Sequence, residues 1–341
     1  MALATVLFAM WGFLWAGYFA LDGFDLGVGM LFLLLGKGEA KRKVLINSIG
    51  PVWNGNEVWL IAAGSVTFAA FPAAYAGIFS SFYLLVALLI ATIIFRGLAF
   101  DFRSKGGQRW TRTWDAAFAV GSIIPAFLFG VIFGNIFRGL DMGPGGFSGS
   151  FLSLLNPYAL LSGVLFLALF AYHGSAWLSL KTGGELQRRA ADAADVSLIF
   201  LVLSGAIFIV YTVFGTHMFD NYVNHPGWWI VPALLIASLA ASRYFLMKRY
   251  SAAAFLASGF AVVMTVFFAV VGLYPDLLPS SRSGAFSITI SSAAASGYAL
   301  WLMLGVLVIF MPLVIGYQLW VYRVFRSPLL EEVVMKDEDA Y

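Results

Sequence analysis

The stretch Leu-Asp-Gly-Phe-Asp-Leu-Gly-Val-Gly (residues 21–29) decides the fold, because it sets two carboxylates inside an apolar run of about 4–35. Roughly 20 apolar residues cross the ~30 Å hydrocarbon core of a bilayer as one helix. Asp22 and Asp25 are three residues apart and therefore lie on one face of that helix. The glycines among them allow another helix to approach closely. The stretch predicts a membrane helix packed against protein.

The composition extends this prediction to the whole chain. Of its 341 residues, 61% are hydrophobic and 11% are charged, against about 25% charged in a typical soluble domain. Cysteine is absent, which excludes disulfides, thiolate metal sites and iron–sulfur ligation, and we expect no metal site. The net charge of +3 comes from loops between apolar runs, so we expect no nucleic-acid partner.

Nine apolar runs are long enough to span a bilayer. They cover about 4–35, 50–71, 74–100, 114–137, 157–180, 195–218, 228–246, 253–274 and 297–322. The sequence therefore predicts an all-α polytopic membrane protein, with a single transmembrane domain over 1–341 and a short cytoplasmic tail at 327–341. Gly50 and Pro51 interrupt the start of the second run, where a bent or re-entrant entry is the alternative.

The basic residues predict the orientation. If nine spans alternate across the membrane, 18 of the 20 Lys and Arg fall on one side, and Arg138 and Arg282 fall on the other. Positively charged loops stay in the cytoplasm. We therefore expect the N-terminus outside the cell and the C-terminus in the cytoplasm.

A weak internal repeat suggests a duplicated architecture. The segments 35–42 and 181–188 both follow a span and share a glycine, an acidic residue and basic residues. The repeat would make two four-helix units, 1–138 and 157–275, with 297–322 as an added helix. The alternative is that membrane helices often end in glycine followed by basic residues.

Three carboxylates within the first two spans are the main candidate site. A charged residue near the bilayer centre costs about 2.5–3.5 kcal/mol, so such residues usually face protein or water and have a function. Asp22, Asp25 and Glu57 are these residues. Neighbouring carboxylates in an apolar site repel one another, so one of them can exchange a proton near neutral pH. We expect proton or cation handling, and the alternative is an acid pair that only bonds a neighbouring helix.

Other polar residues have candidate roles in the same half of the chain. Arg96 is the expected counter-ion for a carboxylate on the first or second span. Asp101 is either a cytoplasmic proton entry or a solvated interfacial charge. Asp115 begins the fourth span, where a carboxylate favours the helix dipole. His173, inside the fifth span, is either a haem ligand or a hydrogen-bond partner of a neighbouring helix.

The motifs together resemble one family, and they occur in order over essentially the whole chain. They are LDGFDLGVG (21–29), INSIGPVWNGNEVWL (46–60), FRGLAFDFRSK (95–105), WD followed by GS (114–122), FGN (133–135), LNPY (155–158), KTGGEL (181–186) and SITISSAAAS (287–296). The chain resembles subunit II of the cytochrome bd-type quinol oxidases, the haem-free partner of a haem-bearing subunit I.

The resemblance implies the reaction and the cofactors. The complex would oxidise quinol near the outer face, reduce O2 to water and contribute to the proton gradient of a bacterial or archaeal inner (cytoplasmic) membrane. Two haems b, and a haem d or a further haem b, would lie in subunit I, with no catalytic centre in this chain alone. It leaves open a small single-helix accessory subunit and a bound structural quinone.

The resemblance also assigns roles to residues. Asp25, Asp101 and the position of Asn54 match acids proposed along a proton path, and Trp59 matches a tryptophan near an oxygen route. Asn54 departs from the pattern, because close relatives often carry Asp there, and Glu57 is its candidate replacement. The rival hypothesis, from the buried acids and the repeat, is a proton- or cation-coupled secondary transporter.

Overall fold

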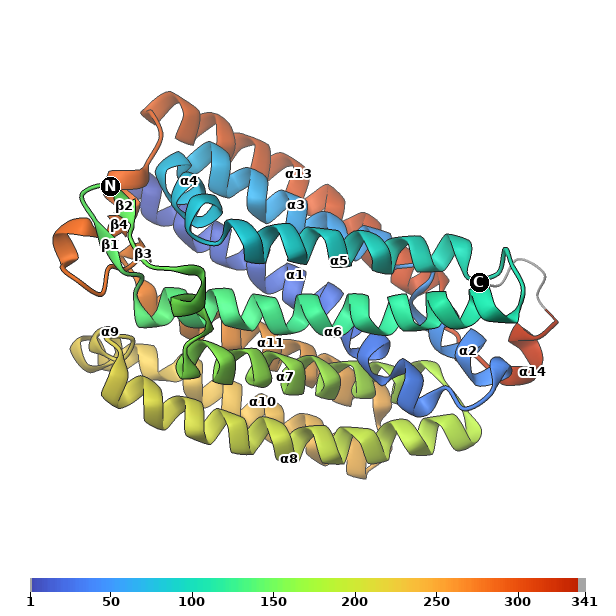
Figure 1. The fold of residues 1–341 in the computed structure, drawn as a ribbon. Coiled ribbons are helices and arrows are strands. Elements are labelled where there is room, and N and C mark those ends of the chain that lie inside the picture. The colour runs from blue at the N-terminus through green and yellow to red at the C-terminus, as the bar shows by residue number, and fades with distance from the viewer. Residues whose placement is uncertain (1, 337–341) are drawn as a thin grey trace.

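The computed structural model describes residues 2–336 as a bundle of long helices (Figure 1). The long helices are α1 (Ala2–Leu35), α3 (Trp53–Ala70), α5 (Tyr83–Phe102), α6 (Gln108–Arg138), α7 (Pro157–Lys181), α8 (Gly184–Gly215), α10 (Ile230–Met247), α11 (Ser251–Leu273) and α13 (Gly297–Val324). Among the described residues, eight helices are long and apolar enough to cross a membrane, or up to nine if the bent pair of α3 and a short helix after it counts as one span. The predicted all-α polytopic fold is confirmed.

Short elements cover the two ends of the bundle. They are α2 (Glu39–Ile49), α4 (Pro72–Ser81), α9 (Asp220–Asn224), α12 (Ile290–Ala293), α14 (Glu331–Val334), the antiparallel pairs β1 (Met142–Gly143) with β2 (Gly146–Phe147) and β3 (Asp276–Leu278) with β4 (Ile288–Thr289), and 3₁₀ turns at Phe151–Leu155, Pro226–Trp229 and Gly284–Phe286. The strands and α9 lie at the end where α1 begins, and α2 and α14 lie at the opposite end (Figure 1). We call these the strand end and the α2 end.

The second and third predicted spans differ from the structure around two prolines. The segment before Pro51 forms α2, which we did not expect because its mean hydropathy is low, and the second span begins at Trp53. The predicted span 74–100 is divided between α4 and α5, and α4 is turned by 119° from α3. Phe71 leaves the helical conformation because the proline ring of Pro72 disfavours it in the preceding residue.

The predicted start of the sixth span was also too late. The structure begins α8 at Gly184, eleven residues before the predicted 195. The extra turns are polar on one face, but Leu186, Ala190 and Ala194 are buried on the other. A hydropathy criterion finds only the uniformly apolar part of such a helix.

The centre of the bundle is α1. It packs against α3, α6, α7 and α11. In an apolar 18-residue stretch of α1, 72% of the residues are buried, whereas the corresponding share in α13, at the periphery, is 11%. A Cβ atom at Gly27 would lie 2.0 Å from the carbonyl oxygen of Phe170, so α1 and α7 meet backbone to backbone. Gly23 and Gly27 thus let α7 approach α1 closely, and Gly29 packs against Ser122 of α6.

The chain after α13 folds back across the α2 end. The Lys181 ammonium, at the end of α7, donates to the carbonyl oxygen of Ser327 at 2.9 Å and also to that of Phe325. The Leu329 amide donates to the carbonyl of Lys181, and α14 packs on α2 with Val334 buried. Residues 327–336 of the predicted tail therefore bind the end of α7 and pack on α2. Residues 337–341 of that tail lie outside the described residues.

Candidate functional site

Arg96 lies at the centre of a buried charge cluster between α1, α3 and α5. Its side chain has no exposed surface, and its Nη2 atom lies 2.6 Å from Oδ1 of Asp22 and 2.7 Å from Oε1 of Glu57. One guanidinium nitrogen therefore bridges acids from two helices. The structure brings together four of the predicted site residues, Asp22, Asp25, Glu57 and Arg96, which we call the charge cluster.

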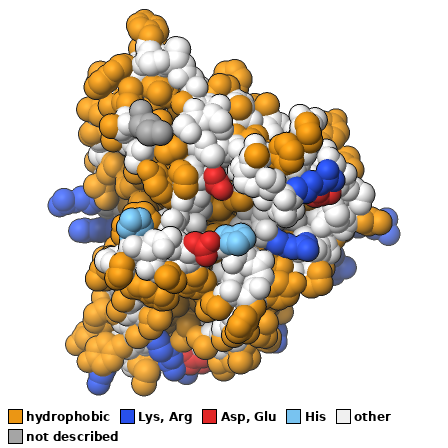
Figure 2. All heavy atoms as spheres, turned by 90° about the vertical axis from the view of Figure 1, so that its left-hand side faces the viewer, with side chains coloured by type: hydrophobic (Ala, Val, Ile, Leu, Met, Phe, Trp, Pro, Cys, Tyr) orange, Lys and Arg blue, Asp and Glu red, His pale blue; other side chains and the backbone are white. Residues whose placement is uncertain are grey.

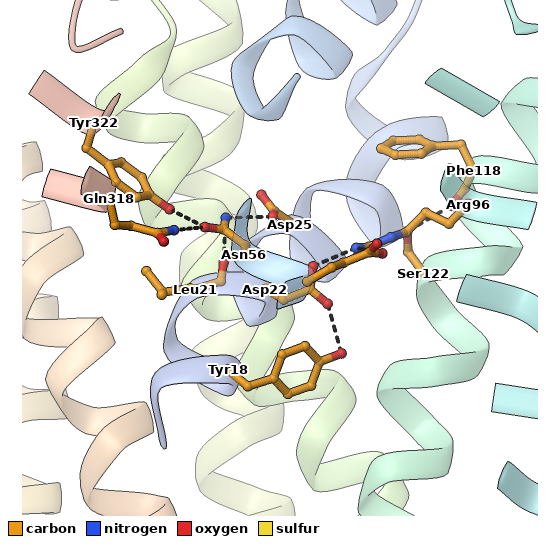
Figure 3. Close-up of polar contacts among 11 residues, drawn as sticks. Tyr18, Leu21, Asp22, Asp25, Asn56, Arg96, Phe118, Ser122, Gln318 and Tyr322 are labelled. Carbon is orange, nitrogen blue, oxygen red and sulfur yellow. Dashed lines mark hydrogen bonds and ion pairs between the residues drawn. The ribbon is translucent and has the colours of Figure 1, made fainter. Parts of the chain in front are cut away.

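Asp22 is held on both carboxylate oxygens. Oδ1 accepts from Arg96, and Oδ2 accepts from the Tyr18 hydroxyl at 2.9 Å, one helical turn away on α1 (Figure 3). Both side chains are fully buried. Charge-assisted hydrogen bonds are strong, so a carboxylate with a charged partner on one oxygen and a hydroxyl on the other is fixed in position.

Asp25 is held on one oxygen only. Its Oδ2 accepts from Nδ2 of Asn56 at 2.8 Å, whereas Oδ1 is buried and makes no hydrogen bond with any described residue. Nε and Nη1 of Arg96 are likewise buried without a partner among the described residues. Buried polar atoms are nearly always hydrogen-bonded, so these three mark a place where protein partners are incomplete.

The sequence analysis missed Tyr18 of α1 and two further residues of this site. The amide oxygen of Asn56 accepts from Nε2 of Gln318 at 2.5 Å and from the Tyr322 hydroxyl at 2.9 Å, both on α13 (Figure 3). The available signal was weak. A glutamine and a tyrosine four residues apart in an otherwise apolar span share a helix face, but nothing in the sequence pairs them with a residue 262 positions away.

Glu57 is the most accessible acid of the cluster. Its side chain keeps 20% of its surface exposed, while those of Asp22 and Arg96 keep none. Glu57 therefore connects the cluster to the outside of this chain.

Asn54 and Asp101 are not brought to the cluster. Both are exposed, and neither makes a hydrogen bond or ion pair with the described part of the chain. Asn54 precedes Asn56 by two residues, a turn of about 200° around α3, so the two amides point to opposite sides. Asp101 lies near the end of α5, on its exposed surface.

Trp59 lies one turn beyond Asn56 on the same face of α3. Its indole packs on Gly17 of α1, where an added Cβ would lie 2.3 Å from the ring. Its Nε1 donates to Oε1 of Gln318 at 3.3 Å. The structure therefore makes Trp59 part of the hydrogen-bonded chain that ends at Asp25.

The histidines do not fit a haem. Nε2 of His173 lies 2.9 Å from the carbonyl oxygen of Ala20, Nδ1 lies 2.7 Å from the Ser258 hydroxyl, and Phe255 stacks on the ring. Both ring nitrogens are thus occupied by protein atoms. His217 and His225 are exposed at the strand end. In the described residues, no three His, Cys, Asp or Glu side chains are grouped to hold a metal ion.

A second ionic group lies at the α2 end. Asp115 binds Nε of Arg103 and Nη1 of Arg42, each at 2.7 Å, and Arg103 also binds Glu39. The sequence analysis interpreted Asp115 as a charge at a helix start. It is wrong on this point, because α6 begins seven residues earlier and Asp115 joins α6 to α2 and α5 through its arginines.

A cavity lies at the strand end, away from the charge cluster. It has a volume of about 710 Å³ and is lined by the ends of α6, α8 and α11, including Arg138, Asp220, Asp276 and Arg282. Burial raises the pKa of Asp276 above its usual value. Figure 2 shows this end, with scattered charged and histidine side chains on a largely apolar and uncharged surface. None of the charge-cluster residues lines the cavity.

Comparisons with known proteins agree with one another. The family model described as "Cytochrome bd terminal oxidase subunit II" matches residues 3–325. The chain is 32% identical to the cytochrome bd-I ubiquinol oxidase subunit 2 of Escherichia coli K12, over 97% of this chain and 96% of that protein. It is 33% identical to the cytochrome bd ubiquinol oxidase subunit 2 of Bacillus subtilis, over 96% of each.

The fold is similar to that of a solved structure. The bd oxidase from Geobacillus thermodenitrificans contains a chain that superposes with a TM-score of 0.79 at 16% identity, covering 95% of this chain and 99% of that one. At this identity the likeness concerns the fold alone.

Proposed function

The chain belongs to the cytochrome bd terminal oxidase subunit II family, and we propose that in such an oxidase it is the haem-free subunit that delivers protons toward a haem-bearing subunit I. As a member of this family it is a subunit of a membrane-bound respiratory oxidoreductase. The named relatives act on ubiquinol, and we propose a quinol as the electron donor here too. The haems, two b and a d or further b, belong to subunit I in this proposal, since the histidines of this chain do not fit one.

The charge balance of the cluster is the observation that carries the proposal. Asp22 and Glu57 contact the Arg96 guanidinium and Asp25 lies one helical turn from Asp22, so full ionisation of the three carboxylates would leave two negative charges that this arginine does not compensate. An unpaired buried charge costs several kcal/mol, which is avoided when a carboxylate takes up a proton. The cluster therefore holds at least one exchangeable proton.

The contacts distribute the roles among the acids. Asp22 is held on both oxygens and serves as the fixed counter-ion of Arg96. Oδ1 of Asp25 has no hydrogen-bond partner among the described residues, and it is the atom we assign to hold the mobile proton. Glu57, the partly exposed member, passes that proton between the cluster and the surface of the chain that meets subunit I.

Water completes this path in our proposal. The unpartnered Oδ1 of Asp25 and the unpartnered Nε and Nη1 of Arg96 are the positions where internal water molecules would bind, since such molecules satisfy buried polar atoms. Asp101, exposed near the α2 end, is the proposed entry residue, and Asn54 contributes no proton step because an amide does not exchange one in this way.

The membrane orientation is part of the proposal. We place the α2 end in the cytoplasm of a bacterial inner membrane, because 18 of the 20 Lys and Arg sort to that side. Asp25 lies ten residues before the end of α1 at that side, or about 15 Å along the helix. Protons drawn from the cytoplasm would reach it first among the buried acids of α1.

An oxygen route past Trp59 remains a proposal that rests on the resemblance alone. The small apolar cavity in the core, of about 50 Å³, is lined by Phe19, Phe133, Phe166 and Phe208 among others, and Trp59 is not one of them. An accessory single-helix subunit and a bound quinone are likewise proposals that rest on the resemblance alone.

The test uses the purified complex and Asp25→Asn. The wild-type complex should contain a haem-bearing partner, seen in a reduced-minus-oxidised optical spectrum. The Asp25→Asn complex should keep that spectrum while quinol oxidation falls roughly tenfold or more, as for loss of an acid–base group. Unchanged turnover across pH would remove Asp25 from the path. Loss of haem or of assembly would instead show a structural role.

A further inference from the structure

We infer that Gln318 and Tyr322 of α13 are positioning residues for Asp25, and that they act through the amide of Asn56. The inference rests on the proposed role of Asp25 and deepens it, because it names the residues that decide which of the two Asp25 oxygens is left for the proton. Three helices, α1, α3 and α13, contribute to this arrangement.

Every hydrogen-bonding position of the Asn56 amide is in use. Its Nδ2 donates to Oδ2 of Asp25 at 2.8 Å and to the carbonyl of Leu21 at 3.2 Å. Its Oδ1 accepts from Gln318 and Tyr322. An amide has two donor hydrogens and two acceptor lone pairs, so this residue is satisfied completely.

The partners on α13 fix which way the amide points. If the Asn56 amide turned over, its oxygen would face the Asp25 carboxylate and the Leu21 carbonyl, and its NH2 group would face the NH2 group of Gln318. Both arrangements place like groups together. The orientation that donates to Asp25 is therefore held from the side opposite to Asp25.

The hydrogen bonds from Trp59 to Asp25 all have the same donor-to-acceptor direction. Trp59 donates to Gln318, Gln318 donates to Asn56, and Asn56 donates to Asp25. Hydrogen bonds aligned in this way polarise and strengthen one another. The chain delivers a donor to Oδ2 and leaves Oδ1 of Asp25 as the free oxygen.

The rest of α13 shows that this contact is specific. The neighbouring side chains Tyr317, Leu319 and Trp320 are 61–66% exposed, whereas that of Gln318 is 9% exposed. Burying a polar group lowers stability unless it is hydrogen-bonded, and an apolar side chain would fill the same space without that requirement. Packing alone therefore does not explain a glutamine and a tyrosine at these two positions.

The test compares matched variants in the assembled oxidase. Tyr322→Phe and Gln318→Met remove the two donors to Asn56 singly, and the double variant removes both. Tyr317→Phe makes the same chemical change on an exposed tyrosine of α13 and is the control. The readouts are haem content, turnover, and the infrared band of the Asp25 carboxyl, identified as the band that Asp25→Asn abolishes.

We expect the Asp25 band to shift in the double variant and to shift less in Tyr322→Phe, with haem content unchanged. Turnover of the double variant should fall roughly fivefold, the size of one hydrogen bond, and Tyr317→Phe should match the wild type. An Asp25 band at its wild-type frequency in the double variant would overturn the inference. If that variant does not assemble, an unshifted band in Tyr322→Phe overturns it equally.

The band separates this inference from the proposed function. If Asp25→Asn turns over normally, the proton path fails, but a shifted band in the α13 variants still shows that they position Asp25. If Asp25→Asn is slow and the band does not move, the path stands and the positioning role falls.

Discussion

The two halves of the bundle each contain an arginine paired with an acid from another helix, and the two pairs differ in depth. Arg96 of α5 is fully buried between Asp22 and Glu57. Arg243 of α10 lies 3.1 Å from Asp195 of α8, and the two side chains are 35% and 46% exposed. Exposed pairs contribute about 0–1 kcal/mol, whereas removing one partner of a buried pair costs about 3–5 kcal/mol. Of these two pairs, only the one in the first half is buried.

Several buried polar groups of the second half make neutral hydrogen bonds. The Tyr172 hydroxyl donates to Ser242, which donates to the carbonyl of Ala254, and His173 lies against Ser258. The described charged side chains with unpartnered buried atoms, Asp25 and Arg96, are both in the first half. The polar contacts of the second half therefore serve helix packing, whereas the first half contains charged atoms that lack a hydrogen-bond partner in the described part of the chain. This contrast also weakens the transporter alternative, which needs a matching site in the second half.

We propose that the two pairs descend from one ancestral unit. In the units 1–138 and 157–275, α5 and α10 hold the same place, and each carries the arginine. The packing has a matching order, because α6 packs on α7 as α11 packs on α1. In this proposal the acids near Arg243 were lost or moved outward, while those near Arg96 were kept.

The largest expected effect comes from replacing the arginine of each pair. Arg96→Met removes the counter-ion of the buried Asp22 and of the partly exposed Glu57, and it should lower the free energy of unfolding by about 3–5 kcal/mol. Arg243→Met should lower it by less than about 1 kcal/mol. The yield of assembled complex and its thermal unfolding measure both. Equal losses in the two variants would contradict the contrast.

The next effect concerns the fixed acid of each pair. Asp22→Asn removes the charge that Arg96 binds and should cost about 1.5–3 kcal/mol, the range for hydrogen bonds to charged groups. Asp195→Asn, the control from the exposed pair, should cost about 0.5 kcal/mol or less. The midpoint of thermal unfolding is the measurement. A small cost for Asp22→Asn would mean that Glu57 alone suffices for Arg96.

A smaller effect is expected at the accessible acid. Glu57→Gln retains an oxygen for Arg96 but exchanges no proton, so assembly should be normal while turnover falls roughly three- to tenfold, less than for Asp25→Asn. Quinol-dependent oxygen consumption per haem measures it. Turnover at the wild-type level would take Glu57 out of the path and leave it as a structural partner of Arg96.

The smallest effect is expected at the exposed pair of Asp141 and Arg282 at the strand end. The hydrogen bond from Arg282 lowers the pKa of Asp141 below its usual value, so the pair stabilises the fold above about pH 4 and stops doing so as the pH falls through the lowered pKa. Arg282→Gln should lower the Tm by at most about 2 °C at pH 7, with the difference shrinking as the pH falls below about 4. A difference that persists in acid would contradict this assignment.

The free-energy cost of placing a side chain in an apolar span explains which parts of the site the sequence could predict. Asp22, Asp25, Glu57 and Arg96 are expensive in an apolar span, so their presence alone predicted a site. Gln318 and Tyr322 cost less free energy in an apolar span, so they attract no attention in the sequence. Their partner, Asn56, is over 260 positions away, and only the packed helices bring them together.

The distinction between Asn54 and Asn56 needed the helix register. The two residues differ by two positions, and the side that faces α1 depends on where α3 begins after the Gly50–Pro51 break. The spans themselves followed from length and apolarity, while the bend at Phe71 and the helix α2 depended on prolines and on packing that hydropathy does not measure.

The position of α13 in the chain has a consequence for biosynthesis. A ribosome makes α1, with Asp22 and Asp25, before it makes Gln318, Tyr322 and the segment that bonds to Lys181. Until the last span enters the membrane, the Asn56 amide lacks the partners that orient it. The hydrogen bonds that orient the Asn56 amide toward Asp25 therefore form only after α13 has been made and inserted, so a chain that lacks α13 would carry the acids without this arrangement.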